Sequence, residues 1–317
     1  MIAHLPWRLR SALLETICEE RDPFTVMSAL AQKCGVIRFV AQGDYGLIQS
    51  SSRDQTILRS YALEGTFAKS TNERLSWFFA TRGGGGTYID VGANIGLTTI
   101  AVAKNPLVHC IAIEPDPENF ANLVANISAN CPHGNVDMRQ AAISDATGHL
   151  TLALSPDNLG DHRVRKESQA NDPDGVGRRR ISVEAVRLDS FAADIKVPLA
   201  VKIDTQGAEP FVIAGGSDVL SRADLLTIEF DPRLMRMAGG DPRMVVNFLT
   251  RHFSVGRMAF RDQEAQSEPA ATSQIAEELL KAVEVGSDRP FYWFDITVAK
   301  RLDDLTPPLR NSTRASP

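Results

Sequence analysis

The chain has 317 residues, of which 43% are hydrophobic and 23% are charged, as is typical of one large α/β domain with an appendage or of two domains. The formal net charge of −5 and the sequence pI of about 5.7 argue against nucleic acid as a partner, because nucleic-acid-binding proteins present positive surfaces. Acidic residues interrupt the apolar positions that a signal peptide would need, and no apolar run approaches the roughly 20 residues of a membrane helix. We therefore expect a cytoplasmic protein with no transmembrane segment.

The spacing of the four cysteines bears on metals and disulfides. Cys18, Cys34, Cys110 and Cys131 form no C-x-x-C pair, and no His/Cys cluster has the spacing of a zinc site. Cysteines in a reducing cytoplasm stay free. We expect buried free thiols and no metal site, with Cys110 in the core.

The N-terminal residues predict helices and a hairpin. Residues 1–35 have apolar positions at helical spacing, and Pro23 is placed to begin a second helix. Two short strands are predicted at 36–40 and 45–49, and Gly43-Asp44 between them suits a hairpin turn.

A second helical region leads to the first domain boundary. Residues 54–82 are predicted to be helical with an interruption at Gly65, and the glycine run that follows Arg82 indicates a flexible joint. The predicted organisation is an N-terminal cap over 1–82, a catalytic domain over 83–300 and a flexible tail over 301–317. We expect the cap to cover part of the site.

A strand, a glycine turn and a helix follow in succession. Residues 87–91 are β-branched and aromatic, which favours a strand, and residues 97–104 have helical spacing. Gly92 and Gly96 bracket the turn, where a residue without Cβ lets a ligand approach the backbone. This unit predicts a ligand site over the end of the strand.

Two acidic residues near this turn narrow the ligand class. The turn has the form G-x-x-x-G, so the dinucleotide fingerprint fails at its middle glycine. Asp90, at the end of the strand, would repel a pyrophosphate but would suit a cationic or zwitterionic ligand. Glu114 ends a second apolar strand at 108–113, where a carboxylate can accept two hydrogen bonds from a ribose diol. Together they suggest an adenosine-bearing ligand without a diphosphate, such as S-adenosylmethionine.

Strands and helices alternate in the rest of the chain, which predicts an α/β fold with a parallel sheet covered on both faces. Asp116 is placed to cap a helix that begins at Pro117. A long polar stretch at 155–180 lies between two strands of a predicted antiparallel addition, and stretches of this length are functional or disordered. The remaining strands are predicted at 136–143, 150–154, 181–186, 199–204, 225–230, 253–260 and 291–298, and the remaining helices at 208–214, ending at Gly215-Gly216, at 242–251 and at 273–284.

Three blocks, Asp90-Val-Gly-Ala-Asn-Ile-Gly96, Glu114-Pro115 and Lys202-Ile-Asp-Thr-Gln-Gly-Ala-Glu209, lie within about residues 87–230. As a set they resemble the FkbM family of S-adenosylmethionine-dependent methyltransferases. The resemblance implies a Rossmann-like class I methyltransferase sheet of seven strands, the last antiparallel, with a hairpin-bearing segment before it. The family often carries Glu where Gln206 stands, and an amide there weakens any acid–base role for the position.

The resemblance implies S-adenosyl-L-methionine as the cofactor. Asp90 and Asn94 are expected to contact its methionine end, directly or through water, and Glu114 its ribose; the alternatives are a turn-forming Asp90 and a helix-capping Glu114. Asp145 suits either a contact with the adenine amine or a turn. The residues expected to bind the cofactor are Asp90, Gly92, Ala93, Asn94, Gly96, Glu114, Pro115, Ala142 and Asp204.

Methyl transfer to a hydroxyl needs alignment of the reacting atoms and removal of the hydroxyl proton. His162 is the first candidate for the base, because it is the histidine of the long polar stretch, in Gly160-Asp-His-Arg163. Asp161 could orient its ring, and Arg163 could hold an anionic acceptor. The three arginines at 178–180 suit either a solvated face or an acceptor contact.

Acidic residues are the alternative catalytic groups. Asp204 and Glu209 are expected near the methyl group, although Glu209 could equally be a first-turn carboxylate favoured by the helix dipole. Glu229 ends the next strand and is expected to border the acceptor pocket.

We therefore predict an S-adenosylmethionine-dependent methyltransferase that methylates a hydroxyl on a small-molecule or glycan acceptor, such as a sugar, a glycolipid or a secondary metabolite. Two alternatives stay open. One is a dinucleotide-dependent oxidoreductase, against which the missing middle glycine argues. The other is a non-catalytic cofactor-binding module, which Gln206 keeps open.

Overall fold

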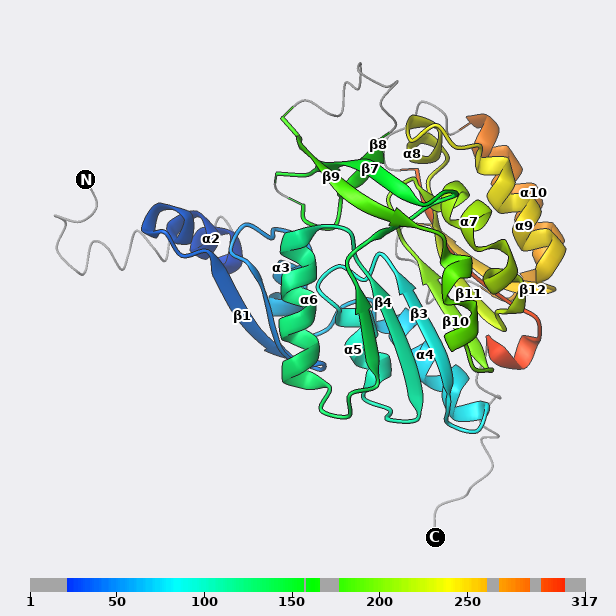
Figure 1. Cartoon of the computed structure of the whole chain (residues 1–317), viewed down its shortest axis with the longest axis horizontal. Helices are drawn as coiled ribbons and strands as arrows, with labels where there is room; N and C mark the ends of the chain where they lie inside the picture. Colours follow the sequence, from blue (N-terminus) through cyan, green and yellow to red (C-terminus); the bar gives the residue numbers. More distant parts are fainter. Residues whose placement is uncertain (1–21, 157, 166–176, 261–267, 286–291, 306–317) are drawn as a thin grey trace, which may run out of the picture.

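Eight strands form the central sheet of the computed structural model, which describes residues 22–156, 158–165, 177–260, 268–285 and 292–305 (Figure 1). In sheet order they are β13 (Ala270–Ala271), β12 (Val255–Phe260), β14 (Phe294–Ala299), β11 (Leu225–Phe230), β10 (Leu199–Ile203), β3 (Gly86–Val91), β4 (Val108–Ile113) and β5 (Val136–Arg139). The five strands from β11 to β5 are parallel, and β14 is antiparallel to both β11 and β12. The predicted seven-stranded sheet with an antiparallel last strand is confirmed, and the two-residue β13 is added at one edge.

The strand order reverses between β3 and β10. The chain passes from β3 outward to β4 and β5, then returns across the sheet to β10 and β11. At the carboxyl ends of the two central strands, the Asp204 amide donates to the Val91 carbonyl at 3.0 Å. Open α/β sheets bind ligands beyond such a reversal. The fold therefore brings residues 92–96 and 204–206 to the edge where a ligand is expected.

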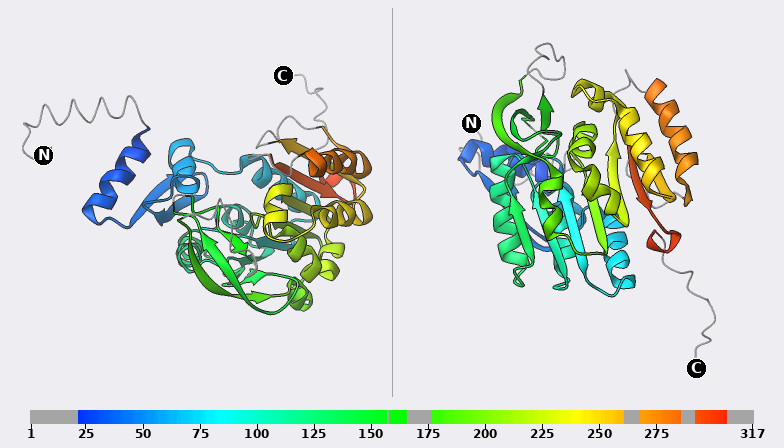
Figure 2. Two further views of the ribbon diagram at one scale, coloured as in Figure 1. Left: turned by 90° about the horizontal axis from the view of Figure 1, so that it is seen from above. Right: turned by 45° about the vertical axis from the view of Figure 1, so that its right-hand side comes forward.

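Helices cover both faces of the sheet, as the views in Figures 1 and 2 show. Alternate residues of each strand serve separate cores: Ile89 and Val91 of β3 pack on one side, and Tyr88 packs on the other. The first core includes residues of α7 (Glu209–Arg222), α9 (Pro242–His252) and α10 (Thr272–Val285), and the second includes residues of α4 (Lys69–Thr81), α5 (Leu97–Ala103) and α6 (Pro117–Asn130). Asp116 caps α6 as predicted, accepting from the Asn119 amide at 2.9 Å.

The helix end predicted at Gly215-Gly216 coincides with a kink in α7. Gly216 leaves helical backbone angles, with φ −132°, and a second helical segment continues from the kink to Arg222. A Cβ on Gly215 would lie 1.9 Å from the Ser144 carbonyl oxygen, and one on Gly216 would lie 2.8 Å from Leu188 Cβ. These glycines therefore allow α7 to pack closely against its neighbours at the kink.

A second sheet is formed by strands that lie between β5 and β10 in the chain, and it has the order β6-β9-β7-β8. It consists of β6 (Ala142–Ile143), β9 (Arg179–Val186), β7 (Gly148–Leu154) and β8 (Arg163–Arg165), followed by the 3₁₀ helix η3 (Leu188–Asp194). The antiparallel pairing of β7 with β9 is confirmed. The single strand predicted at 136–143 is wrong, because β5 pairs with β4 in the central sheet whereas β6 pairs with β9. The polar stretch at 155–180 also contains a strand, β8.

The last described residues are packed against the domain. The 3₁₀ helix η6 (Leu302–Asp304) places the buried Asp304 carboxylate on Arg82, with Nε and Nη2 at 2.7 and 2.6 Å. Leu305 is also buried. The flexible tail predicted over 301–317 is therefore wrong for residues 301–305, and residues 306–317 lie outside the described part.

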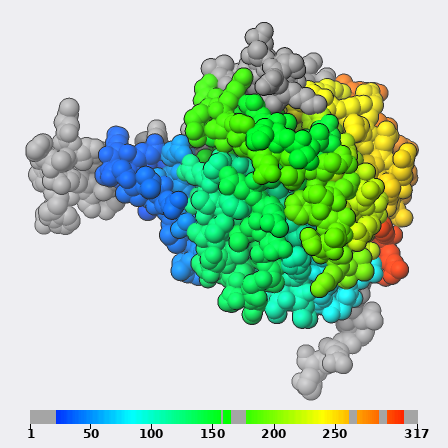
Figure 3. Space-filling model, in the orientation of Figure 1, coloured from blue at the N-terminus to red at the C-terminus, as the bar shows by residue number. Residues whose placement is uncertain are grey.

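The N-terminal elements project from one side of the molecule, where Figures 1 to 3 show them in blue. The hairpin prediction is confirmed, with the turn at Asp44-Tyr45, and Gly65 ends α3 in a left-handed conformation. The helix predicted before residue 22 lies outside the described residues, and the boundary after residue 82 stays a prediction. The elements are α2 (Pro23–Cys34), β1 (Arg38–Gly43), β2 (Gly46–Ser51) and α3 (Ile57–Glu64).

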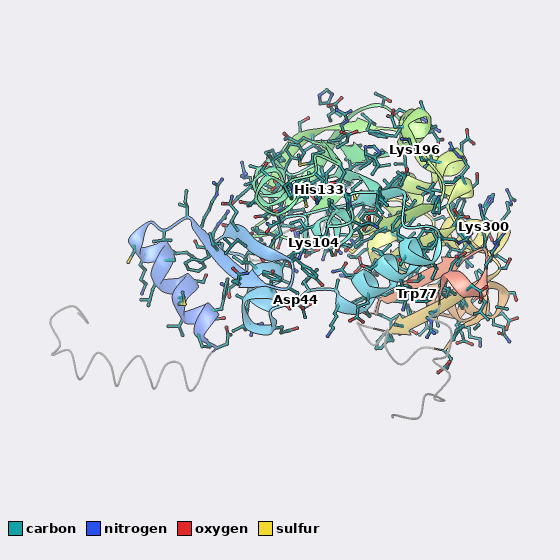
Figure 4. The ribbon with its side chains drawn as sticks, turned by 90° about the horizontal axis from the view of Figure 1, so that it is seen from below. Asp44, Trp77, Lys104, His133, Lys196 and Lys300 are labelled. Atoms are coloured by element: carbon teal, nitrogen blue, oxygen red, sulfur yellow. The ribbon has the colours of Figure 1, made fainter. Side chains whose placement is uncertain are left out.

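Asparagines of α6 attach the hairpin to the domain. Asn126 accepts from the Gln49 amide at 2.8 Å and donates to the Gln49 carbonyl at 3.0 Å, and Asn130 makes the same pair of bonds with Leu47. The outer edge of β2 is thus satisfied by side chains, as a further strand would satisfy it. At the tip of the hairpin, the Lys104 ammonium donates to the Asp44 carbonyl at 2.7 Å; Figure 4 labels both residues.

Membrane and cysteine expectations can be compared with the structure. None of the helices in the described ranges is long and apolar enough to cross a membrane. Cys110 and Cys131 are buried, but Cys34 is exposed, so its predicted burial is wrong; Cys18 lies outside the described residues.

We expect Asn126→Ala to destabilise the protein, because it leaves the Gln49 backbone groups and the Ile95 carbonyl without their side-chain partner. Unsatisfied buried groups cost about 1–3 kcal/mol each, and partial rehydration makes about 2 kcal/mol in total a reasonable expectation. Urea unfolding measures the change, with the exposed Ser128→Ala on the same helix as the control. A loss below about 0.5 kcal/mol would contradict the attachment.

Candidate active site

A cavity opens at the carboxyl edge of the central sheet, where the strand order reverses. It includes about 850 Å³ of space between protein atoms, part of which is open to solvent. In sheet order, its lining runs from residues 141–143, through Glu114 and Pro115 after β4 and residues 92–95 after β3, to residues 204–206 after β10. Three neighbouring parallel strands therefore supply this wall.

Residues from distant parts of the chain complete the lining. Ile57 and Phe67 come from the N-terminal elements, and Leu159 comes from the polar stretch before β8. The Leu159 carbonyl is held by two side-chain amides, from Asn94 at 2.9 Å and from Asn119 at 2.8 Å. Hydrogen bonds from the glycine turn and from α6 thus hold Leu159 of the polar stretch at the cavity.

All five backbone amides of residues 92–96 donate within the protein. A loop that binds a diphosphate must present backbone amides that have no protein partner. This turn presents none. In chain order the acceptors of its five amides are the Ile113 carbonyl for the first two, Glu114 Oε2, Asn94 Oδ1 and the Ala93 carbonyl.

Gly92 is required by the protein backbone itself. Its φ is +86°, and a Cβ there would lie 1.9 Å from the Asp204 carbonyl oxygen. The close approach of β3 and β10 therefore needs this glycine, which also lines the cavity, and the expectation that it lets a ligand approach stays a prediction. A larger residue at position 92 would disturb folding, so it cannot serve as a test of binding.

Glu114 joins the glycine turn to the start of α6 and lines the cavity. Its carboxylate accepts from the Asn94 amide at 2.9 Å and from the Asp116 amide at 2.8 Å. Burial raises the pKa of Glu114 to about 8, although both amide bonds oppose the shift. Each carboxylate oxygen keeps a second lone pair, so the group can still accept bonds from a ligand.

Asp90 lies behind the cavity wall. It is fully buried, accepts from Thr99 Oγ1 at 2.7 Å and does not line the cavity. Burial raises the pKa of Asp90, although Lys202 and Thr99 oppose the shift. Direct contact with a ligand, as the sequence suggested, is therefore corrected to an indirect role: Asp90 Oδ1 lies 3.8 Å from the Lys202 ammonium, which does line the cavity.

Lys202 is a cationic group of the cavity lining that belongs to the third motif block, but the sequence assigned it no role. Its Nζ lies 3.2 Å from Asp204 Oδ2 and 3.8 Å from Asp90 Oδ1. Burial alone lowers the pKa of Lys202, but the two carboxylates outweigh it and raise the pKa above its ordinary value. A charged residue inside an otherwise buried strand was the signal that could have identified it.

Asp204 and Gln206 form the cavity wall beyond β10. Asp204 takes the Lys202 ammonium on Oδ2 and, at 2.9 Å, the Gln206 amide on Oδ1. The same Gln206 nitrogen donates to Glu229 Oε2 at 2.8 Å. Gln206 adopts a left-handed backbone with φ +53°, which directs its side chain between the two carboxylates.

Glu209 does not line the cavity, and this placement argues against its predicted catalytic role. Its carboxylate is buried and accepts from the Thr205 amide and hydroxyl, both at 2.9 Å, and from the Gly207 amide at 3.0 Å. Burial raises the pKa of Glu209 to about 7. The group therefore secures the turn between β10 and α7, in agreement with the first-turn alternative.

His162 lines the cavity, and the protein engages its ring by a hydrogen bond at Nδ1. Nδ1 accepts from the Ser155 amide at 3.0 Å, and Nε2 lies 3.8 Å from Asp116 Oδ2. Burial lowers the pKa of His162, and Asp116 opposes the shift. With Nδ1 accepting, the neutral ring carries its proton on Nε2 and has no free lone pair for a substrate proton. This geometry argues against His162 as the base.

The neighbours of His162 also differ from expectation. Asp161 does not orient the ring, since its carboxylate accepts from Arg163 Nε at 2.5 Å and from Arg178. Arg163 is therefore already engaged, and so is Arg178. The predicted contact of Arg163 with an anionic acceptor would have to compete with this ion pair.

Some of the remaining predicted residues line the cavity and others do not. Ala93, Asn94, Pro115 and Ala142 line the cavity. Asp145 does not, and its Oδ1 accepts from Ser144 Oγ at 3.0 Å, which agrees with the turn alternative. Gly96 also lies outside the lining. Among the residues that the structure describes, no group of three His, Cys, Asp or Glu side chains could hold a metal ion.

Glu209 gives a prediction for stability against pH. Because its pKa is about 7 when folded and about 4.3 in an unfolded chain, the folded state retains the proton longer, and stability falls as pH rises across this window. Glu209→Gln removes this titration. The free energy of unfolding of the variant should therefore fall less with rising pH than that of the wild type, by up to roughly 3 kcal/mol. Glu114 contributes a further decline up to about pH 8 in both proteins.

Urea unfolding between these pH values measures the difference. The exposed Glu278→Gln on α10 is the control, because it removes a carboxylate with 55% side-chain exposure. Parallel stability curves for the wild type and Glu209→Gln would contradict the prediction.

Three solved structures are similar to this chain at low identity. Precorrin-6y C5,15-methyltransferase from Geobacter metallireducens GS-15 is 13% identical, with 74% of this chain and 93% of that chain covered and a TM-score of 0.34. TYW2 of M. jannaschii, solved with AdoMet, is 12% identical, with 83% and 85% covered and a TM-score of 0.39. Magnesium protoporphyrin IX methyltransferase (ChlM) from Synechocystis PCC 6803, solved with SAM, is 12% identical, with 74% and 79% covered and a TM-score of 0.35.

None of the curated proteins matches the chain. The family described as "Methyltransferase FkbM domain" matches residues 90–253, slightly more than half of the sequence. This range contains all three motif blocks that line or support the cavity. The chain therefore belongs to the FkbM methyltransferase family.

Proposed function

We propose that this methyltransferase transfers the methyl group of S-adenosylmethionine to a hydroxyl of a small-molecule or glycan acceptor. The single observation that carries the proposal is the cavity, which joins Glu114 after β4 to Asp204 and Gln206 after β10. S-adenosylmethionine supplies an activated methyl group on a positively charged sulfur. The residues of the chain must bind this cofactor, align the acceptor, exclude water and accept a proton.

The residues at the cavity suit the parts of this cofactor. Glu114 can accept hydrogen bonds from a ribose diol, and the apolar residues 141–143 suit the adenine. At the other side of the lining, Lys202 and Asp204 offer opposite charges to a zwitterionic methionine group. Ile57 and Phe67 cover the cavity with apolar surface, which supports the exclusion of water.

The oxidoreductase alternative has less support. A dinucleotide needs amides for its diphosphate, and the amides of residues 92–96 already donate within the protein. Among the described residues, Lys202 is the only lysine of the lining, and two carboxylates neutralise it. An adenosine ligand with a net positive charge matches these groups better than a dianion.

Glu114 should control cofactor affinity through its protonation. A ribose diol favours the ionised carboxylate, so binding below pH 8 should release a proton, and affinity should rise as pH approaches the folded pKa of about 8. Glu114→Gln should weaken S-adenosylhomocysteine binding about 10- to 100-fold, since it removes a charged acceptor worth about 1.5–3 kcal/mol. It should also abolish the proton release.

Calorimetry in buffers of different ionisation enthalpy measures both quantities. Asp145→Asn is the matched control, because Asp145 lies outside the cavity lining and its loss should leave binding unchanged. Wild-type affinity in a folded Glu114→Gln protein would remove Glu114 from the proposed site.

The kinetics of a His162→Ala variant can distinguish a covering role of this residue from a catalytic one. If it only holds the polar stretch over the cavity, His162→Ala should raise the KM for the cofactor and leave kcat within about threefold of wild type. A base would instead give a kcat loss of about 100- to 10,000-fold with the cofactor KM unchanged. Steady-state kinetics distinguish the two outcomes, with the exposed His149→Ala as the control.

Screening acceptors with methyl-labelled S-adenosylmethionine tests the function as a whole. Label should appear on a hydroxyl of a sugar, a glycolipid or a secondary metabolite. Tight cofactor binding with no transfer to any pool would favour the non-catalytic module. Label on nitrogen or carbon would retain methyl transfer and exclude O-methylation.

A further inference from the structure

Gln206 connects the cavity wall to a carboxylate that lies outside it. Its Nε2 carries two hydrogens and donates one to Asp204 Oδ1 at 2.9 Å and the other to Glu229 Oε2 at 2.8 Å. A neutral amide thus bridges the two carboxyl groups. Because Gln206 itself lines the cavity, Glu229 is one side chain away from the space that a ligand would enter.

Glu229 differs from the other carboxylates near the cavity in having an oxygen available. Asp204 takes a donor on each oxygen, and Glu209 is engaged by the turn that follows β10. Glu114 is used by two backbone amides and stands near the opposite end of the lining. Glu229 accepts from Gln206 on Oε2, whereas Oε1 receives no hydrogen bond from the residues that the structure describes.

The surroundings of Glu229 favour a proton on its carboxyl group. Burial raises the pKa of Glu229 well above its ordinary value, and neighbouring carboxylates raise it further. Four carboxylates raise the pKa of Glu229, and they lie after β10, on α7, on β14 and after β11. In that order they are Asp204, Glu209, Asp295 and Asp231. The nearby cation is Lys202 of β10. A carboxylate in such surroundings takes up a proton more readily than an ordinary carboxylate.

We propose that Glu229 is the base that receives the proton of the acceptor hydroxyl, and that Gln206 is the residue that positions it. The inference rests on the proposed methyl transfer to oxygen. As the acceptor oxygen forms its bond to the methyl carbon, the carbon–sulfur bond breaks and its electron pair stays on sulfur. The hydroxyl proton passes to Glu229 Oε1 and is later released to solvent.

The assignment also explains the amide at position 206. A glutamate there would place three carboxylates together with no donor between them, and one would have to hold a proton. Gln206 removes this competition and leaves Oε1 of Glu229 as the proton acceptor. Gln206 itself cannot act as an acid or base, and the proposal assigns that role to Glu229, its hydrogen-bond partner on β11.

The first experiment titrates the Glu229 carboxyl group in the full chain without acceptor or cofactor. Glutamate labelled with ¹³C at the carboxyl carbon is observed by NMR, and Glu229→Gln identifies the resonance. We expect a midpoint at least about one unit above the ordinary glutamate value of about 4.3. Gln206→Met, which keeps the volume and removes the donor, should raise the midpoint further. An ordinary midpoint, or one that Gln206→Met leaves unchanged, overturns the proposal.

The second experiment measures turnover with the acceptor found by screening. Glu229→Gln should lower kcat at least about 100-fold, and S-adenosylhomocysteine affinity should stay within about threefold. Glu278→Gln is the control, since it removes an exposed carboxylate that pairs with Lys281 on α10, and it should keep its kcat within about threefold. Wild-type turnover in Glu229→Gln overturns the base and leaves methyl transfer intact. Failure of the wild type to bind S-adenosylhomocysteine overturns the proposed function, and the inference with it.

Discussion

The close approach of two backbones at Gly92 is the constraint on which the site depends. With the Asp204 carbonyl oxygen 1.9 Å from where a Cβ would stand, β3 and β10 can meet at their carboxyl ends only if residue 92 is glycine. The turn that results uses all its amides internally. Recognition of a ligand therefore falls to side chains around the turn, which include Glu114, the ion pair of Lys202 with Asp204, and apolar residues.

Burial is the common cause of the unusual carboxyl groups around the cavity. Glu114 and Glu209 are buried and Glu229 is half-buried, and loss of solvent raises the pKa of each. The fold uses them differently: Glu209 secures a turn, Glu114 joins the glycine turn to α6 while still facing the cavity, and Glu229 retains a free oxygen. The available lone pairs, and not the raised pKa alone, separate structural carboxylates from candidate functional ones.

The N-terminal elements are part of the site as well as an appendage. Asparagines of α6 satisfy the edge of β2, which fixes the hairpin against the domain, and Ile57 and Phe67 then reach the cavity lining. On the other side, Leu159 is held by Asn94 and Asn119. Side-chain amides thus attach two covering segments to the sheet, because an amide can donate to and accept from backbone groups at once.

The sequence by itself determined the central strands, the glycine turn, the cap at Asp116 and the family, since each depends on short-range pattern or on motif spacing. It also brought Asp90, Glu114 and Asp204 into one region, because strand ends of a parallel sheet share an edge. Only the tertiary structure decided that β5 and β6 belong to different sheets, that His162 and Glu209 are engaged by the protein, and that Gln206 joins Asp204 to Glu229. The physical reason is that hydrogen-bond partners and burial depend on residues far apart in the chain, and local sequence pattern carries no record of which lone pairs those contacts will occupy.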